Sequence, residues 1–371
     1  MKAKLMRAAV VVLKLIYIPF MPVKPKNKIT FLSRQSDNPT VDIKLLDEGL
    51  DDRKIKTVVL TKRLNKTVGG FLSYSIHMLL QMYHISTSKL LVLDGYCILA
   101  SILPKKDDQK IVQIWHALGA IKKFGYQSIG KPEGNDPEIA RVMRLHEKYD
   151  YVIAPGRTTA ECYSEAFNIS KDKIKLYGLP RIDYLVEESK AIEDRIKSVY
   201  PQVAERENIL YVPTFRKNKN NDVTELIKNA RLEKYNLIIR KHWLDKTDYS
   251  WVKEYGVIVD KRFSSLEWLK FCSKVVTDYS AVAFEAAILE KQLYFYINDV
   301  DDYIEKIGLN IELEKESIGD YVFSDSISLW NAVDDEYDPD KIREFKSKYI
   351  NVAVENCTSR LAEFLISNME E

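Results

Sequence analysis

Short apolar runs alternate with amphipathic segments along most of the chain from Lys28 onward. The runs are rich in β-branched residues and apolar at successive positions, which is typical of strands buried on both faces of a parallel sheet. One series lies at 29–32, 57–60, 90–94, 111–115, 151–154 and 174–177, and a second at 208–212, 236–240, 257–260, 274–277 and 293–296. Segments with helical spacing, such as 67–83, separate them. The pattern predicts an α/β protein with two doubly wound, Rossmann-like domains facing a cleft.

Changes in this pattern set the expected boundaries. Residues 1–27 form a separate basic and apolar segment, and residues 28–186 form the first Rossmann-like domain. Residues 187–207 are rich in charge and contain a proline, so we interpret them as a linker region. Residues 208–371 form the second domain, whose last part, 340–369, has helical spacing and is expected to supply closing helices. A return of these helices to the first domain is the alternative.

The amino-terminal segment supports two interpretations. It is apolar from Ala8 to Val23 apart from Lys14, and every charged residue in 1–28 is a lysine or arginine. It is too short to span a bilayer, which needs about 20 apolar residues, and no small-residue cleavage pattern of a signal peptide follows. One hypothesis is an amphipathic helix that lies on an anionic membrane surface. The other is a first helix that packs on the protein itself.

Composition excludes several classes of protein. A chain of 371 residues with 46% hydrophobic and 30% charged residues is globular rather than disordered, and it is large enough for two cores. Its cysteines lie far apart and its histidines form no HExxH pair, so neither a disulfide framework nor a zinc site is indicated. The acidic run Asp299, Asp301 and Asp302 reads as a solvated loop. We expect no metal, no cofactor and no nucleic-acid partner.

Two strand-to-helix turns carry the strongest candidates for chemistry. His116 follows the run 111–115, and an imidazole with a pKa near 6.5 suits a general base, although a structural histidine is the alternative. The second turn, Thr277-Asp278-Tyr279-Ser280, leads from a strand into a helical segment. Its backbone N–H groups favour phosphate, although Asp278 or Ser280 would equally suit a helix cap.

Further cations follow other strand ends. His242 stands beside Arg240 and Lys241, which together suit a pyrophosphate clamp or, alternatively, a basic strand end facing water. Arg181 and Arg216 each follow a turn that contains a proline. The planar guanidinium fits phosphate oxygens, and pairing with a nearby carboxylate is the alternative for both.

Five of these elements occur in a familiar order: Trp115-His116, the turn Gly178 to Asp183, Pro213-Thr214 with Arg216, His242, and Thr277 to Ser280. With them the chain resembles the CDP-glycerol glycerophosphotransferase family, the teichoic-acid polymerases and primases with a GT-B fold, over about residues 28–365. The resemblance implies that an acceptor hydroxyl attacks the β-phosphorus of a CDP-activated glycerol or ribitol phosphate. CMP is released and a phosphodiester is formed.

The same resemblance implies roles for the two domains and their residues. Residues 28–186 become the acceptor side and residues 208–371 the donor-nucleotide side. His116, as the base, and His242 become the catalytic candidates, and Gly119 and Lys122 belong to the acceptor side. The expected donor and phosphate ligands are Arg181, Asp183, Thr214, Arg216, Lys241, Thr277, Asp278, Tyr279 and Ser280.

The implied partners are a CDP-activated polyol, a polyol-phosphate or lipid-linked glycan acceptor, and an anionic membrane surface. The expected location is the cytoplasmic face of the cell membrane, with peripheral attachment. Two other functions stay open. One is a GT-B glycosyltransferase or epimerase that uses a sugar nucleotide. The other is a catalytically silent membrane-associated binding protein, because Ala117, Trp243 and Ala281 stand where the family often has glycine, proline and serine.

Overall fold

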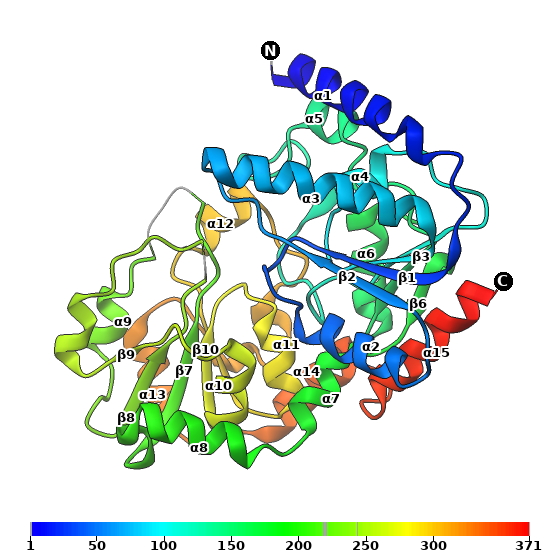
Figure 1. Ribbon diagram of the computed structural model, residues 1–371. Coiled ribbons are helices and arrows are strands. Elements are labelled where there is room, and N and C mark those ends of the chain that lie inside the picture. Colours follow the sequence, from blue (N-terminus) through cyan, green and yellow to red (C-terminus); the bar gives the residue numbers. More distant parts are fainter. Residues whose placement is uncertain (1, 218–220, 243, 371) are drawn as a thin grey trace. The chain divides into compact units, whose positions relative to one another are not determined.

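The computed structural model describes residues 2–217, 221–242 and 244–370, and Trp243 lies outside them (Figure 1). The chain forms two compact units. Unit 1 consists of Met1–Leu118, Phe124–Tyr184 and Val352–Glu371, and unit 2 of Gly119–Lys123 and Leu185–Asn351. Each unit contains a six-stranded sheet. All strand pairs in both sheets are parallel, which confirms the predicted α/β fold class.

The sheet of unit 1 has the order β2-β1-β3-β4-β5-β6. Its register is set by pairs such as Ile29 with Thr57 and with Leu90. Apolar side chains on both faces of β1 and β3 are buried, as the continuous apolar runs predict. The strands are β1 (Lys26–Ser33), β2 (Thr57–Thr61), β3 (Ser88–Leu93), β4 (Lys110–Gln113), β5 (Tyr151–Ala154) and β6 (Ile174–Leu176).

Helices cover this sheet, and the last of them comes from the far end of the chain. Helix α15 packs against α2, as Figure 1 also shows, and against β1 and β3. The closing helix expected with the second domain therefore belongs to unit 1. The α-helices that lie wholly in unit 1 are α1 (Lys2–Tyr17), α2 (Val41–Asp51), α3 (Val68–Thr87), α4 (Ile98–Ile102), α5 (Pro137–Val142), α6 (Arg157–Phe167) and α15 (Cys357–Glu370). The 3-10 turns are η1 (Ile18–Phe20), η2 (Gly125–Ser128) and η3 (Lys171–Lys173).

The sheet of unit 2 has the order β12-β11-β10-β7-β8-β9. Its strands are β7 (Glu207–Val212), β8 (Tyr235–Ile239), β9 (Ile258–Val259), β10 (Lys274–Thr277), β11 (Gln292–Tyr296) and β12 (Val322–Phe323). Its α-helices are α8 (Lys190–Val199), α9 (Thr224–Lys228), α10 (Ser265–Phe271), α11 (Val282–Ile288), α12 (Val300–Lys306), α13 (Ser326–Asp334) and α14 (Pro339–Tyr349). Helix α7 (Pro180–Val186) carries the chain from unit 1 into unit 2.

Two expected boundaries differ from those of the structure. The charge-rich segment 187–207 is no free linker, because Ile192 and Ile196 of α8 are buried within unit 2. Residues 119–123 leave unit 1 and join unit 2. There the Lys123 N–H donates to Gly308 O at 3.0 Å, and Ile121 O accepts from the Asn310 N–H at 2.7 Å. The chain therefore crosses between units three residues after His116.

Candidate active site

His116 lies in a strained turn that follows β4. The preceding Trp115 has φ +58, a left-handed conformation that bulky residues rarely adopt. Gln113 Oε1 accepts the Trp115 N–H at 2.9 Å, and the indole stacks on Phe124 with ring centroids 4.7 Å apart. These contacts hold the backbone in its strained conformation. Such stabilised strain is common at functional sites.

The ring of His116 has a defined tautomer. Its Nδ1 lies 2.8 Å from the carbonyl oxygen of Asp94 and 3.2 Å from the side-chain amide of Gln35, which must present its oxygen to a protonated Nδ1. A carbonyl oxygen can only accept, so Nδ1 carries the proton and Nε2 of the neutral ring has the lone pair. This is the tautomer that a general base acting through Nε2 requires.

The carboxyl group of Asp94 is buried next to this turn. Its Oδ2 accepts hydrogen bonds from Ser33 Oγ at 2.8 Å and Thr40 Oγ1 at 3.3 Å, while Oδ1 has no hydrogen-bond partner among the described residues. Burial raises the pKa of Asp94 to about 6, against the lowering effect of the two hydroxyl groups. The sequence places this residue at a strand end, but its burial depends on the tertiary fold.

A second histidine, His146, lies in the aromatic cluster beside Trp115 and Phe167. Its Nδ1 is 2.9 Å from the hydroxyl of Tyr149. Burial, and to a lesser extent the charge of His116, lowers the pKa of His146 to about 3. His146 therefore stays neutral at physiological pH and supports the turn of His116.

In unit 2, Arg216 joins two carboxylates. Its Nε and Nη2 donate to the oxygens of Asp299 at 2.9 and 3.1 Å, and Nη2 lies 3.0 Å from Asp278 Oδ2. Nη1 donates to Thr214 O at 2.9 Å. Burial opposes the charge, but the two carboxylates outweigh it and raise the pKa of Arg216. We call Arg216, Asp278 and Asp299 the arginine bracket. The interpretation of Asp299 as solvated is wrong, because its side chain is 13% exposed and paired.

Asp278 and Thr277 connect the loops at the ends of β7 and β10. Both oxygens of Asp278 accept the Thr214 N–H, at 2.8 and 3.0 Å, and Thr277 Oγ1 donates to Val212 O at 2.7 Å. The hydroxyl of Thr214 is buried without a hydrogen-bond partner among the described residues. Thr214 is thus the candidate in this loop whose side chain has hydrogen-bonding capacity left for a ligand.

The turn after β10 leads into helix α11. The hydroxyl of Tyr279 donates to Asp299 Oδ1 at 3.1 Å, and its ring stacks on Tyr303 with centroids 4.0 Å apart. Ser280 Oγ accepts the Val282 N–H at 3.4 Å, which is a weak capping contact. The cap and the phosphate interpretations of Ser280 both remain compatible with this geometry.

His242 follows β8 and has the opposite tautomer to His116. The Leu244 N–H donates to its Nδ1 at 3.2 Å, so the proton of the neutral ring lies on Nε2. Its ring stacks on Phe215 at 5.5 Å. The neighbouring Lys241 donates to Thr247 O at 3.2 Å and lies 5.5 Å from the ring centre of Tyr249. His242 is therefore set to donate a hydrogen bond through Nε2.

Gly119 and Lys122, expected on the acceptor side, belong to unit 2. A Cβ at Gly119 would lie 2.5 Å from ring atoms of Phe284, so only glycine fits against α11. Burial lowers the pKa of Lys122; Asp278 raises it, and Arg216 lowers it further. Lys122 thus lies in the electrostatic field of the arginine bracket, in the unit expected to hold the donor.

Arg181 and Asp183 have structural partners in unit 1. Arg181 forms a buried ion pair with Asp42, to which its backbone N–H and its Nε both donate at 2.8 Å. The carboxylate of Asp183 accepts the N–H groups of Cys357 and Thr358, at 2.9 and 2.7 Å, at the start of α15. The structure does not bring these two residues into the arginine bracket, and their donor role stays a prediction.

A family model described as CDP-glycerol:poly(glycerophosphate) glycerophosphotransferase matches residues 16–367. The chain belongs to this family. The resemblance seen in the sequence is therefore confirmed, as is the assignment to the transferases. Within the described residues no group of three or more histidine, cysteine or acidic side chains is arranged to hold a metal. The expectation that this glycerophosphotransferase works without a metal stays a prediction.

Relatives of this glycerophosphotransferase align along most of its length. The chain is 27% identical to the teichoic acid ribitol-phosphate primase of Bacillus spizizenii, covering 94% of this chain and 92% of the relative. It is 26% identical to the teichoic acid glycerol-phosphate primase of Bacillus subtilis, covering 92% of each.

Solved structures identify the fold as GT-B. The wall teichoic acid polymerase TagF, in a histidine variant soaked with CDPG, superposes with a TM-score of 0.75 at 19% identity, over 100% of this chain and 97% of that one. The UDP-GlcNAc 2-epimerase of Neisseria meningitidis superposes with a TM-score of 0.59 at 14% identity, over 92% and 99%. At such identities both matches establish the fold of this glycerophosphotransferase and not its substrate.

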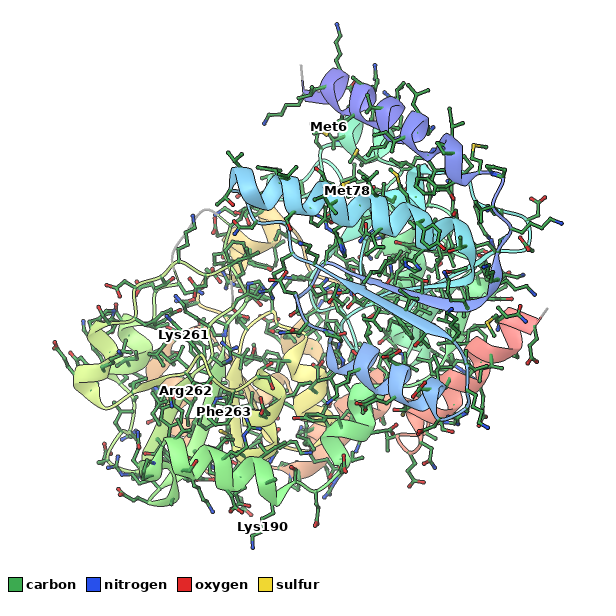
Figure 2. All side chains as sticks on the ribbon, viewed as in Figure 1. Met6, Met78, Lys190, Lys261, Arg262 and Phe263 are labelled. Atoms are coloured by element: carbon green, nitrogen blue, oxygen red, sulfur yellow. The ribbon has the colours of Figure 1, made fainter. Side chains whose placement is uncertain are left out.

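Helices α1 and α3 leave apolar faces uncovered in unit 1. Helix α1 packs on α5 and buries Ala3, Val10 and Tyr17. Figure 2 labels Met6 on α1 and Met78 on α3. Among the described residues, no helix has the length and apolar character to cross a bilayer. The exposed apolar residues are Leu5, Val11, Val12, Leu15 and Ile16 on α1 and Val68, Phe71, Leu72, Ile76, Leu79, Leu80 and Tyr83 on α3.

Proposed function

We propose that the chain transfers glycerol phosphate or ribitol phosphate from a CDP-activated donor to an acceptor hydroxyl, in the synthesis of a teichoic acid or a related capsular polymer. The family match along residues 16–367 carries this proposal. Primases for both polyols align with more than nine-tenths of the chain. Both donors therefore belong in the assay.

In the proposed reaction, Nε2 of His116 takes the proton of the acceptor hydroxyl as its oxygen attacks the β-phosphorus. The bond from this phosphorus to the bridging oxygen breaks, and CMP leaves with the electron pair. The Asp94 carbonyl, 2.8 Å from Nδ1, stabilises the imidazolium that forms. The tautomer set by this contact supports His116 as the base.

On the donor side, the proposal gives His242 Nε2–H, Lys122 and Lys241 the task of neutralising charge on the diphosphate. The Leu244 contact that places the His242 proton on Nε2 supports this assignment. The buried hydroxyl of Thr214, which has no hydrogen-bond partner among the described residues, is a further donor. Arg216 acts as a positioning residue, because protein carboxylates already engage it. Neither a metal nor a cofactor is part of the scheme.

The proposal also places α1 on the cytoplasmic surface of the cell membrane, where a lipid-linked or polyol-phosphate acceptor is anchored. Leu15 is 58% exposed and Val12 52%, and Lys2, Lys4 and Lys14 on the same helix suit anionic headgroups. The outward apolar face of α3 enlarges this surface.

The deciding experiment measures nucleotide release from CDP-glycerol, CDP-ribitol and UDP-N-acetylglucosamine in the presence of a lipid-linked acceptor. We expect CMP release from a CDP-polyol and a phosphodiester product whose length mass spectrometry reports. Release of UDP alone would favour the sugar-nucleotide alternative. No release from any donor by a folded, donor-binding chain would favour the silent binding protein.

Membrane attachment has a separate test. The intact chain should co-sediment with vesicles that contain phosphatidylglycerol, and the substitution Val12→Glu should weaken this binding at least fivefold. Matched vesicles of phosphatidylcholine serve as the control. Equal binding of the wild type and the variant would remove α1 from the proposal without touching the transferase activity.

A further inference from the structure

Unit 1 contains a hollow of about 350 Å³ beneath α1, formed by residues with no part in the proposed transfer. Its volume falls in the range of about 300–1,000 Å³ that is usual for small-ligand pockets. The apolar part of its wall comes from three parts of the chain: α1, the turn after it, and the end of α4. These residues are Val11, Leu15, Ile18, Met21, Ile102 and Pro104.

Three cations line the same hollow: Lys14, Arg144 and Lys148. Burial, together with the nearby charges of Arg144 and Lys14, lowers the pKa of Lys148 to about 8. Glu147 lies 3.6 Å from Arg144 in an exposed pair that is worth little, and the nearby Lys105 is already paired with Asp150. The hollow therefore has a net positive rim.

The backbone holds two of these cations in an uncommon conformation. Arg144 has φ +51 and Lys148 φ +72, and a left-handed conformation is infrequent for residues other than glycine, asparagine and aspartate. The ammonium group of Lys148 donates to the Leu103 carbonyl oxygen, which fixes the side chain at the wall. Local structure thus fixes the backbone at both cations and the charged end of Lys148.

We propose that this hollow binds one anionic phospholipid, with the phosphate among Lys14, Arg144 and Lys148 and part of one acyl chain along the apolar wall. Charge complementarity selects the phosphate, and the apolar lining selects the chain. A phosphate without an acyl chain gains only the charge contribution. A zwitterionic lipid gains the full apolar contribution but only part of the charge contribution. The exposed apolar face of α1 borders the site. The proposal therefore rests on the proposed membrane contact of α1, which would bring lipid to the hollow.

The test uses dihexanoyl phosphatidylglycerol below its micelle concentration, with the intact chain in a calorimeter. We expect saturable binding with one lipid per chain. Arg144→Gln with Lys148→Gln should weaken it roughly 25-fold, since each cation near an anionic headgroup contributes about fivefold. Lys190→Gln with Lys253→Gln removes the same charge from unit 2, outside the hollow, and should leave the affinity unchanged. Glycerol phosphate and dihexanoyl phosphatidylcholine should bind at least tenfold more weakly.

A second pair of variants tests the apolar wall at exposed positions, where a substitution does not disturb the core. Leu15→Gln should weaken binding of the monomeric lipid, whereas Val12→Gln, at a similarly exposed position outside the hollow, should not. Non-saturating binding, or equal affinity in all variants, would overturn the site. If vesicles still bind in that case, the membrane contact stands alone. Tighter binding of a prenyl phosphate than of phosphatidylglycerol would overturn the phospholipid as the occupant.

Discussion

The imidazole Nδ1 of His116 lies 2.8 Å from the carbonyl oxygen of Asp94, and the carboxyl group of the same Asp94 is buried, with no partner for one of its oxygens in the part of the chain that the structure describes. One residue therefore acts on the turn in two ways. The backbone carbonyl orients the proposed base and survives any substitution of the side chain. The carboxyl group instead couples this region to pH.

We expect His116→Ala to lower kcat by roughly 10²–10⁴-fold, the usual contribution of a general base. The KM for the CDP-polyol should change little, because His116 is not among the residues proposed to bind the donor. Steady-state CMP release measures both constants. His77→Ala, on α3, is the control for loss of an imidazole. A loss below about fivefold in His116→Ala would remove this residue from the chemistry.

Asp94 predicts a specific dependence of stability on pH. Its raised pKa means that the folded chain binds the proton more tightly than the unfolded chain does. The resulting stabilisation is present below about pH 4 and is lost as the pH rises to about 6, a decrease of about 3 kcal/mol in the free energy of unfolding.

Asp94→Asn should abolish this decrease. The difference in unfolding free energy between the variant and the wild type, measured in urea at pH 4.5 and pH 7.5, should shift in favour of the variant at the higher pH. Asp47→Asn, which changes a carboxyl group on α2, is the control. An unchanged difference across this range would show that Asp94 titrates normally.

Much of this molecule follows from local pattern. The parallel strands, the position of His116 after β4 and that of Asp278 after β10 were all predictable, because each depends on a few consecutive residues. The partners of these residues were not. Arg216 pairs with Asp299, which lies 83 positions away in the sequence. Without that partner, the acidic run that contains Asp299 looks like a solvated loop.

The same limit explains the placement of α15 and of Lys122. The amphipathic pattern of 357–370 shows that one face is buried but not against which sheet. Asp183, which accepts from the start of α15, looks like a phosphate-turn residue until that helix is placed. Residues 119–123 join unit 2 through backbone hydrogen bonds with 308–310, and no side-chain pattern encodes such a contact.

Asp183 offers a direct comparison of a capping and a ligand role. If it caps α15, Asp183→Ala should lower the free energy of unfolding by about 1–2 kcal/mol, while Asp183→Asn should lose less, because its one amide oxygen can still accept one of the two N–H groups. Donor KM should stay within twofold in both variants. An increase in donor KM in the stable Asp183→Asn protein would instead support the predicted donor role.

The arginine bracket should behave as a coupled unit. Arg216→Met leaves Asp278 and Asp299 buried without their cation, and should lower the free energy of unfolding by about 3–5 kcal/mol. Adding Asp299→Asn to this variant should recover part of the loss, because one uncompensated charge is removed. Urea unfolding of the two single variants and the double variant gives the coupling energy. Strictly additive effects would contradict the bracket.

Gly119 tests whether the close packing of residues 119–123 on α11 matters for activity. Gly119→Ala places a Cβ 2.5 Å from the ring of Phe284, and one of the two segments must shift. Because Lys122 lies three residues further on, in the field of Asp278 and Arg216, we expect donor KM to rise by about tenfold or more. Gly69→Ala, where a Cβ meets nothing within 4 Å, should leave KM unchanged. Phe284→Leu combined with Gly119→Ala makes room for the new methyl group and should restore part of the affinity. If the double variant is no better than Gly119→Ala, the contact with Phe284 is not what places Lys122.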